Sequence, residues 1–516
     1  MGLACAAGVL LGAKLNFTPT QNLFSSNAKK EKLNRLIDYI DYEYVDKVNT
    51  DSIVDVTVNN ILENLDPHSV YIPKQEYASV TENMKGDFVG IGVSFYNVND
   101  TIVVIQPLEG GPSKKMGIKA GDRILYANGE QLFDKKMSND SIITQLKGIE
   151  DSMVRLTVFR KGLKDLLKFN VKRSKVPLKS VDAAYMLTKE LGYIKVNRFS
   201  ETTYQEFKES LAKLKSRGAT KIAIDLRDNP GGYLSEAINI VDEFLKDGKL
   251  ILFTKNRKGT IEETYSNRKG NFEDNELYIL INENSASASE IVAGALQDND
   301  RGTILGRRSY GKGLVQREME LGDGSAVRLT IARYYTPTGR SIQKSYKLGN
   351  ESYFNDYTRR YKNGELAHAD SIHVTDSLKY VTPGGKIVYG GGGIIPDIFV
   401  PKDINFEKEN LTYLLRSGFL NRFVFEVLEK DRNYYNSLSL NDFQNKEPVT
   451  QKMISDFSKF ATSENLKFKI DNYKPLLKTY LQAVMAEQLF GSDEFQRIIN
   501  ADDRIINKVI ELSNAN

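Results

Sequence analysis

Three residue types are scarce in this chain of 516 residues, which has no tryptophan, one cysteine and three histidines. A single cysteine, Cys5, cannot form a disulfide within the chain, so the fold has to be stable without such cross-links. The histidines are His68, His368 and His373, and none lies close in sequence to the serine and lysine motifs described below. This inventory argues against a Ser-His-Asp mechanism.

A strong excess of one charge is also lacking, because 71 basic residues face 67 acidic ones for a net charge of +4. The two signs are interspersed along the chain, so nothing in the charge pattern indicates a nucleic-acid partner. A hydrophobic fraction of 41% with 27% charged residues is ordinary for soluble globular protein. The length predicts several domains with a sizeable core.

The N-terminal apolar stretch, residues 2–13, is shorter than the roughly 20 residues needed to cross a bilayer. It also has no basic leader before it, so we interpret residues 1–28 as the remnant of a signal peptide or membrane anchor followed by a linker. A lipid-modified Cys5 is the alternative, although Gly2 stands where an aliphatic residue would be expected. Either reading predicts export to the bacterial periplasm or cell envelope.

The most informative segment is Asn282–Ile291, of sequence NENSASASEI. The apolar run before it, Leu277–Ile281, predicts a buried strand, and residues 287–298 have helical spacing. Ser287 is therefore expected at a strand-to-helix junction, where free amides and the positive end of the helix dipole can stabilise an oxyanion. The small neighbours Ala286 and Ala288 leave room for a peptide, and the amide of Ala288 is a candidate oxyanion donor.

A second motif, Ser309–Gln316, supplies a candidate base in Lys312. A lysine can deprotonate a serine only when its amine is neutral. Lowering its pKa from about 10.4 to about 7 or 8 disfavours the ammonium by roughly 4 kcal/mol, which requires burial and an absence of nearby carboxylates. The uncharged Gly311 and Gly313 suit this requirement, and Gln316 can hold the amine by a hydrogen bond.

Each of these residues also has a purely structural interpretation. Lys312 alone would be a solvated loop charge, Gln316 a strand residue, and Gly232 part of a tight turn that needs positive φ. Ser285 and Ser289 are expected to be a helix cap and a first-turn residue rather than nucleophiles. The remaining charged residues near the motifs are interpreted as ion-pair or turn partners that shape the site: Asp225, Arg227, Asp228, Glu290 and Asp298.

Together the two motifs resemble those of the C-terminal processing peptidases, also called tail-specific proteases, of the Ser/Lys type. The stretches 225–232, 329–343 and 393–400 are similar to that family as well. The resemblance implies that Ser287 is the nucleophile, Lys312 the general base and Gln316 its positioning residue. It further implies that the amide of Gly232 is a second oxyanion donor beside that of Ala288, and that no metal or organic cofactor is needed.

Residues 88–175 resemble a PDZ domain. Gly90, Ile91, Gly92 and Val93 are similar to the carboxylate-binding loop, whose free amides accept a terminal carboxylate while the next strand pairs with an extended peptide. The expected partners are protein or peptide substrates with accessible C-termini. An adaptor protein and a homo-oligomer are further expectations.

The rest of the chain predicts an α/β core, which the resemblance identifies with the layered fold of crotonase and Clp-peptidase relatives. The predicted domains are a helical region at 29–87, the PDZ domain, a peptidase core at 176–403 and a C-terminal helical region at 404–516. Within them we expect strands at 192–196, 221–226, 250–253, 277–282 and 394–400, an extended excursion at 344–390, and helices at 204–215, 234–245, 476–490 and 498–512. The C-terminal helices are expected to pack on the N-terminal helices or on a second copy.

The function predicted from these features is a serine endopeptidase that recognises C-terminal tails through its PDZ domain. Two rival functions use the same residues. One is thioester or amide hydrolysis on small molecules, for which a PDZ groove has no evident purpose. The other is a catalytically idle PDZ scaffold, against which the intact Ser287, Lys312 and Gln316 argue.

Overall fold

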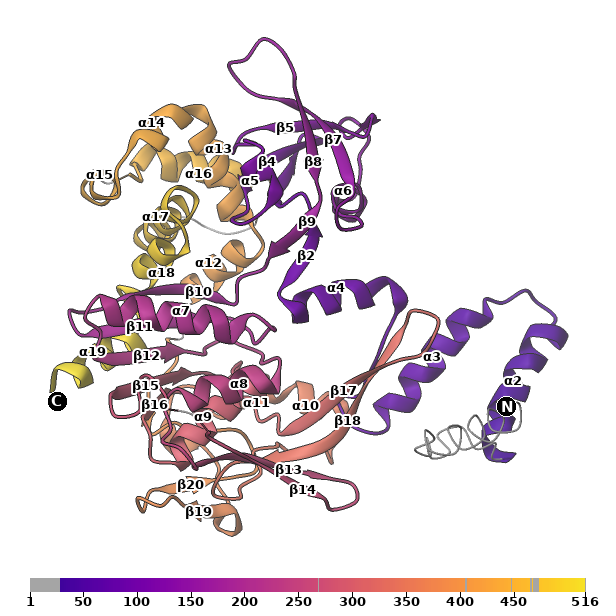
Figure 1. The fold of residues 1–516 in the computed structure, drawn as a ribbon, viewed down its shortest axis with the longest axis vertical. Coiled ribbons are helices and arrows are strands. Elements are labelled where there is room, and N and C mark those ends of the chain that lie inside the picture. Colours follow the sequence, from indigo (N-terminus) through magenta and orange to yellow (C-terminus); the bar gives the residue numbers. More distant parts are fainter. Residues whose placement is uncertain are drawn as a thin grey trace, which may run out of the picture.

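The computed structural model describes residues 28–515 except 268, 404–405, 447, 465 and 467–472. The predicted leader remnant, with Cys5, lies outside the described residues. Figure 1 shows a lower α/β core, a β-rich PDZ region above it, a group of C-terminal helices beside both, and an N-terminal arm of two helices. No helix in the described part of the chain is long and apolar enough to cross a membrane.

A six-stranded sheet forms the centre of the core, in the order β10-β11-β12-β15-β16-β21. The edge strand β10 is antiparallel to β11, and all other neighbours are parallel. This arrangement confirms the α/β class. The strand bounds are β10 Val181–Met186, β11 Leu191–Val196, β12 Lys221–Asp225, β15 Glu276–Ile281, β16 Thr303–Gly306 and β21 Ile398–Phe399.

Helices cover both faces of this sheet, as a mainly parallel sheet requires. Because side chains alternate along a strand, Ile279 of β15 packs with one layer while its neighbour Tyr278 packs with the other. The first layer consists of α7 Thr203–Ser216, α8 Leu234–Asp242 and α9 Ala288–Asp298. The second layer includes α19 Arg504–Ala515, through Ile505, Ile506 and Val509. The run Leu277–Ile281 is thus apolar throughout because it is buried on both faces.

A second, antiparallel sheet borders the site, with β18 at its centre. Its strands are β1 Val70–Ile72, β13 Leu250–Asn256, β14 Ile261–Tyr265, β17 Leu314–Glu320 and β18 Ala326–Tyr335. The short β1 pairs with β18, so the segment predicted only as a helical region at 29–87 also contributes a strand to this sheet. After β1, the helix α4 Lys74–Lys85 leads into the PDZ region.

The PDZ region has its own sheet in the order β3-β4-β5-β7-β8, with β6 paired to β5. Strand β3 lies at the edge of this sheet, where an extended peptide can add. The elements are β2 Asp87–Gly90, β3 Val93–Val98, β4 Thr101–Pro107, α5 Pro112–Lys115, β5 Arg123–Ala127, β6 Glu130–Gln131, α6 Asn139–Leu146, β7 Met153–Phe159, β8 Leu167–Lys172 and β9 Ser174–Pro177. The strands β2 and β9 pair with each other where the chain enters and leaves the PDZ region.

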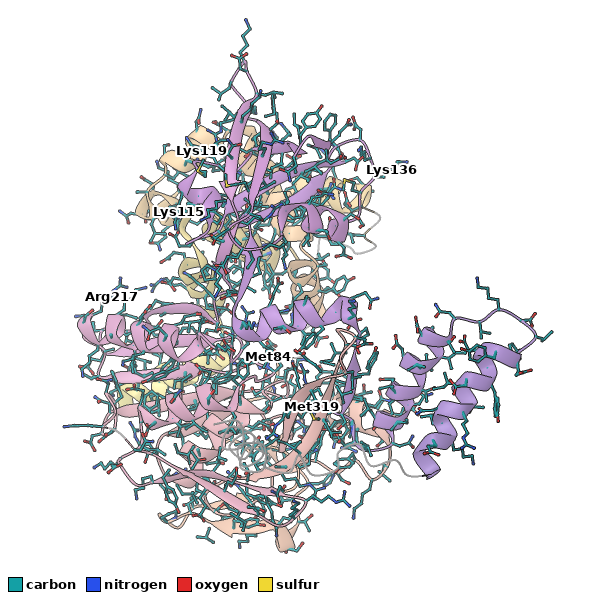
Figure 2. The ribbon with its side chains drawn as sticks, turned by 45° about the vertical axis from the view of Figure 1, so that its right-hand side comes forward. Met84, Lys115, Lys119, Lys136, Arg217 and Met319 are labelled. Carbon is teal, nitrogen blue, oxygen red and sulfur yellow. The ribbon has the colours of Figure 1, made fainter. Side chains whose placement is uncertain are left out.

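The N-terminal arm consists of α2 Ala28–Glu43 and α3 Thr50–Glu63. Figures 1 and 2, two views 45° apart, both show it extending away from the rest of the molecule. Large apolar side chains on it remain exposed, including Leu36 at 54%, Tyr42 at 82% and Val45 at 88%. Within the chain, therefore, much of the apolar surface of this arm has no cover.

The C-terminal helices pack on the core and on the PDZ region, not on the N-terminal arm. Arg227 of the core pairs with Asp503 at 2.7 Å, and Tyr96 of the PDZ region packs on Phe425 in a T-shaped contact. The helices are α12 Phe406–Arg416, α13 Phe419–Lys430, α14 Arg432–Ser437, α15 Leu440–Asn445, α16 Gln451–Ser463, α17 Lys474–Phe490, α18 Ser492–Asn500 and α19. The single helix predicted at 498–512 is wrong, because Asp503 caps α19 by accepting the amides of Ile505 and Ile506 and so starts a new helix.

The predicted extended excursion at 344–390 is also wrong in part, because it contains two helices. These are α10 Asn350–Phe354 and α11 Asp356–Lys362, followed by two 3₁₀ turns, η1 Ala369–Ser371 and η2 Asp376–Leu378, and a small hairpin, β19 Lys379–Val381 with β20 Ile387–Tyr389. The buried Arg360 anchors α11 to the core by donating to the carbonyl of Ser309 at 2.8 Å. The closing strand predicted at 394–400 is reduced to Ile398–Phe399, which alone pairs with β16.

The buried pair of Arg340 with Asp298 generates a stability prediction. The two side chains are fully buried and lie 2.7 Å apart. Asp298→Asn leaves the guanidinium without its counter-charge and should lower the free energy of unfolding by about 3–5 kcal/mol, measured by urea denaturation. The matched control is Asp151→Asn, which breaks the exposed pair with Lys172 and should change stability by about 0.5 kcal/mol or less. Equal effects of the two substitutions would contradict the prediction.

Candidate active site

Ser287 stands at the turn between β15 and α9, as the sequence predicts. Its backbone has φ 55° and ψ −113°, a combination that a residue with a Cβ rarely adopts. Strand β15 ends at Ile281 and helix α9 begins at Ala288, so the serine lies at the N-terminus of α9. Ser287 is partly exposed, whereas Ala286 and Ala288 are buried.

The neighbouring serines are fully buried and used in hydrogen bonds to backbone. The hydroxyl of Ser285 donates to the carbonyl of Leu226 at 2.8 Å, and that of Ser289 donates to the carbonyl of Asn229 at 3.0 Å. Both side chains thereby tie the Ser287 turn to the loop that follows β12. Of the three serines in the motif, only Ser287 is accessible.

The two predicted oxyanion donors come from the loop after β12, which contains Gly232, and from Ala288 at the start of α9. Gly232 forms an isolated parallel β-bridge with Phe199. The donors of that bridge are the amides of Phe199 and Tyr233, so the Gly232 amide has no acceptor among the described residues. The amide of Ala288 is the first of α9 and likewise has no acceptor within the helix. Gly231 fixes their proximity, since a Cβ there would come within 2.7 Å of the Ser287 Cβ and 2.9 Å of the Ala288 nitrogen.

Glu290 and Tyr334 hold the serine turn and the lysine loop together. The buried Glu290 carboxylate accepts the amides of Ser287 and Lys312, each at 2.9 Å, and also the amide of Gly311 and the hydroxyl of Ser309. The hydroxyl of Tyr334 lies 2.8 Å from the carbonyl of Lys312 and 3.2 Å from that of Ser287. The same two side chains therefore fix the backbones of the candidate nucleophile and base.

Lys312 lies in the environment that a neutral amine requires. Burial lowers its pKa to about 8, and the positive charge of nearby Arg328 acts in the same direction. The carboxylates of Glu290 and Asp66 act against this shift without cancelling it. The predicted absence of nearby carboxylates is therefore wrong, although the predicted direction of the pKa holds, because burial outweighs them.

Gln316 contacts the amine as the sequence predicts. Its Oε1 accepts a hydrogen bond from Lys312 Nζ at 2.9 Å, and its Nε2 donates to the carbonyl of His68 at 2.5 Å. The register of β17 against β18 shifts between Val315 and Gln316, a bulge of the kind that re-aims a side chain near an active site. The His68 carbonyl orients the glutamine so that its oxygen faces the lysine.

His68 is therefore close to the site in space, although it is distant in sequence. It borders the same cavity as Lys312. Its Nε2 lies 2.7 Å from the hydroxyl of Tyr353, and burial together with the nearby Lys312 lowers the pKa of His68 to about 3. A neutral ring held by a tyrosine indicates a structural role for His68.

A second buried lysine, Lys344, marks the difference between a structural and a reactive amine. Burial lowers its pKa to about 8 as well. However, its amine pairs with Asp356 at 3.3 Å and lies 3.6 Å from the ring centre of Tyr310. The carboxylate of Asp356 favours the ammonium form of Lys344. Lys312 is different, because its partner is the uncharged carboxamide of Gln316.

The charged residues near the motifs form ion pairs. Asp225 pairs with Arg227 at 2.6 Å, and Asp298 with Arg340. Asp228, at φ 61°, accepts the side-chain amide of Asn284 at 2.7 Å. These contacts shape the loops that flank Ser287.

The four predicted peptide-binding residues lie where the PDZ sheet begins. Gly90 ends β2, Ile91 is buried, Gly92 adopts φ 71°, and Val93 opens the edge strand β3. A Cβ at Gly92 would come within 3.0 Å of the Gly111 backbone, so a close approach of two loops requires the glycine. This loop and the free edge of β3 have the form of a site for an extended peptide end.

No cluster of three or more potential metal-ligating side chains occurs among the residues that the structure describes. Three family models match the chain: peptidase family S41 at residues 190–349, a PDZ domain at 89–172, and a family of unknown function at 410–491. The S41 match includes Ser287, Lys312 and Gln316. The third match includes most of the C-terminal helices.

Similar proteins of bacteria agree with these models. A carboxy-terminal-processing protease of Bartonella bacilliformis is 33% identical over 347 residues, covering 65% of this chain and 79% of that protein. A probable CtpA-like serine protease of Staphylococcus aureus strain MRSA252 is 34% identical over 320 residues, and the chain spans 63% of its length. Among solved structures, the photosystem II D1 C-terminal processing protease aligns over 73% of this chain and 95% of its own, with 23% identity and a TM-score of 0.37.

The backbone of Ser287 generates a second prediction. Holding a residue with a Cβ at φ 55° and ψ −113° stores strain of about 1–3 kcal/mol, which glycine avoids. Ser287→Gly should therefore raise the free energy of unfolding by about 1 kcal/mol relative to Ser287→Ala, with both variants lacking the hydroxyl. Chemical denaturation of the two variants measures the difference. A less stable glycine variant would show that the turn is relaxed.

Proposed function

The chain belongs to the carboxy-terminal-processing proteases of peptidase family S41, a family of serine peptidases, and on this premise we propose that Ser287 and Lys312 form its catalytic dyad. The observation that carries the proposal is the joint anchoring of the two residues by Glu290 and Tyr334. It is supported by the burial that lowers the pKa of Lys312 to about 8.

In the proposed mechanism the neutral amine of Lys312 takes the hydroxyl proton of Ser287 as its oxygen attacks the scissile carbonyl. The amides of Gly232 and Ala288 donate to the oxyanion of the tetrahedral intermediate. The ammonium of Lys312 then gives its proton to the leaving amine, and an acyl-enzyme remains. Water, deprotonated by the same lysine, attacks this ester and releases the second product.

The PDZ domain binds peptide C-termini, and we assign that contact to Gly90, Ile91, Gly92 and Val93. The amides of this loop are suited to a terminal carboxylate, while the edge of β3 is suited to strand addition. Strand addition needs an extended peptide, so the proposed substrates are proteins with unstructured C-terminal ends. This assignment explains why a peptidase core carries a PDZ domain.

Two further expectations remain proposals. The uncovered apolar side chains of the N-terminal arm, such as Tyr42 and Val45, support association with a second copy, with an adaptor protein as the alternative occupant. The apolar stretch at residues 2–13 supports export to the bacterial envelope, with the N-terminus as leader or anchor.

Substitutions of the dyad test the chemistry. Ser287→Ala should abolish cleavage of an unfolded protein and labelling by a fluorophosphonate probe, while binding of a C-terminal peptide persists. Lys312→Arg should be as inactive as Lys312→Ala, because a guanidinium stays protonated and cannot act as a base. The readouts are gel-based degradation, probe labelling and fluorescence anisotropy. An active arginine variant would refute the base assignment, and small-molecule hydrolysis without proteolysis would favour the rival hydrolase function.

The pH dependence tests the same amine. A lysine is competent as a base only above its pKa, so kcat/KM for a peptide should rise with pH up to a plateau, with a midpoint near the Lys312 pKa of about 8. Gln316→Glu places a carboxylate against the amine, which favours the ammonium, and should move the midpoint to higher pH. Initial rates across pH for the two proteins measure the shift. A midpoint that stays in place would contradict the role of Gln316.

A further inference from the structure

One arginine of the C-terminal helices lines the cavity that Lys312 and Ala286 border. A cavity of about 560 Å³ opens beside the dyad, and its wall contains Lys312, Ala286 and Arg416. The remaining wall residues are His68, Asp228, Pro230, Asn284 and Tyr310. Arg416, at the end of α12, is the one member of this described wall that follows the peptidase core in sequence. It lies in the segment matched by the family of unknown function.

The position of Arg416 is set by the packing of α12 among the C-terminal helices and by the contacts of those helices with the core. Leu411 and Leu414 of α12 are buried in the core of the C-terminal helices. That region is in turn fixed to the central sheet, since Arg227 pairs with Asp503, and Asn500 donates to the hydroxyl of Tyr185 at 2.7 Å. The arginine is therefore presented to the cavity by a folded support.

The partner of Arg416 within the chain holds it only weakly. Its guanidinium lies 3.6 Å from Asp228, and the two side chains are 65% and 46% exposed. The other oxygen of Asp228 is occupied by the side-chain amides of Asn282 and Asn284. Exposed ion pairs of this kind contribute little to stability, so the guanidinium can turn some of its five donors to another carboxylate at small cost.

The remaining charges around the cavity leave this guanidinium as its accessible cation. The amine of Lys312 is held inside the site by its hydrogen bond to Gln316 Oε1 at 2.9 Å, and burial keeps His68 neutral. Arg328 pairs with Glu318 at 2.5 Å, and the carboxylate of Glu290 is saturated by its four donors. An arginine in this position matches a carboxylate in both charge and geometry.

We propose that Arg416 is a specificity residue, which binds the carboxylate of an aspartate or glutamate close to the scissile bond of the substrate. The inference rests on the proposed function, because it assumes that peptides are cleaved at Ser287. It gives the C-terminal helices a part in substrate selection. In the competing structural role, Arg416 is a cation favoured by the C-terminal end of the helix dipole and touches no substrate.

The test is a set of peptides that differ only by Asp, Asn or Lys at each of three positions on either side of the scissile bond. At one position or more, wild-type kcat/KM should be about threefold to fivefold higher for Asp than for Asn. Arg416→Ala should remove this ratio, and Arg416→Glu should favour Lys over Asn instead. Arg504→Ala is the matched control, since Arg504 pairs with Asp403 at 3.5 Å with similar exposure and does not border this cavity. It should keep the wild-type ratio.

The outcomes separate the two proposals. If the wild-type protein cleaves none of the peptides, the proposed function fails. If it cleaves them with no preference for Asp at any position, the proposed role of Arg416 is wrong while the proposed function stands. The wild-type protein alone decides this outcome. An Asp preference that survives in Arg416→Ala likewise overturns the inference. Circular dichroism of each variant verifies folding. If the Arg416→Ala protein does not fold, Arg416→Gln takes its place.

Discussion

The buried carboxylate of Glu290 is the contact on which the geometry of the site depends. It lies in the first turn of α9 and accepts four donors, from the serine turn on one side and the lysine loop on the other. Its oxygens have about four lone-pair sites in all, so the network leaves none for the ammonium of Lys312. A carboxylate can thus hold the backbone of a lysine without forming an ion pair with its amine. Burial then decides the balance, and the pKa of Lys312 falls to about 8 despite the nearby negative charge.

The orientation of the amine depends on a part of the chain far from both motifs. Strand β1 pairs with β18, and this pairing brings the carbonyl of His68 to Gln316. Asp66 fixes the same turn by accepting the amides of His68 and Ser69, and it also accepts the hydroxyl of Thr330 on β18. The N-terminal segment is thus a structural part of the site. Displacing β1 from β18 would free the glutamine and remove the partner that keeps the amine in place.

The sequence predicts some of these features and not others, for physical reasons. Strands and helices of the core are predictable because their periodicity is strong, as for α7, observed at Thr203–Ser216 and expected at 204–215. Ser287, Lys312 and Gln316 are named by local motifs. The bulge at Gln316 and the carbonyl of His68 leave no sequence signal, since any residue supplies a carbonyl and the register depends on pairing with a distant strand. Arg416 is likewise one basic helix residue among many until the packing of α12 places it at the cavity.

The C-terminal helices show how covering a sheet can also support a loop. A parallel sheet needs both faces buried, and α19 covers the face that carries Tyr278, Leu280 and Leu305. The turn before α19 presents Asp503 to Arg227, whose other partner, Asp225, ends β12. Directly after this pair the chain forms the loop that ends in Gly232. The helices that bury the sheet therefore also fix the start of the proposed oxyanion loop. The geometry of the proposed site thus depends on how these helices pack.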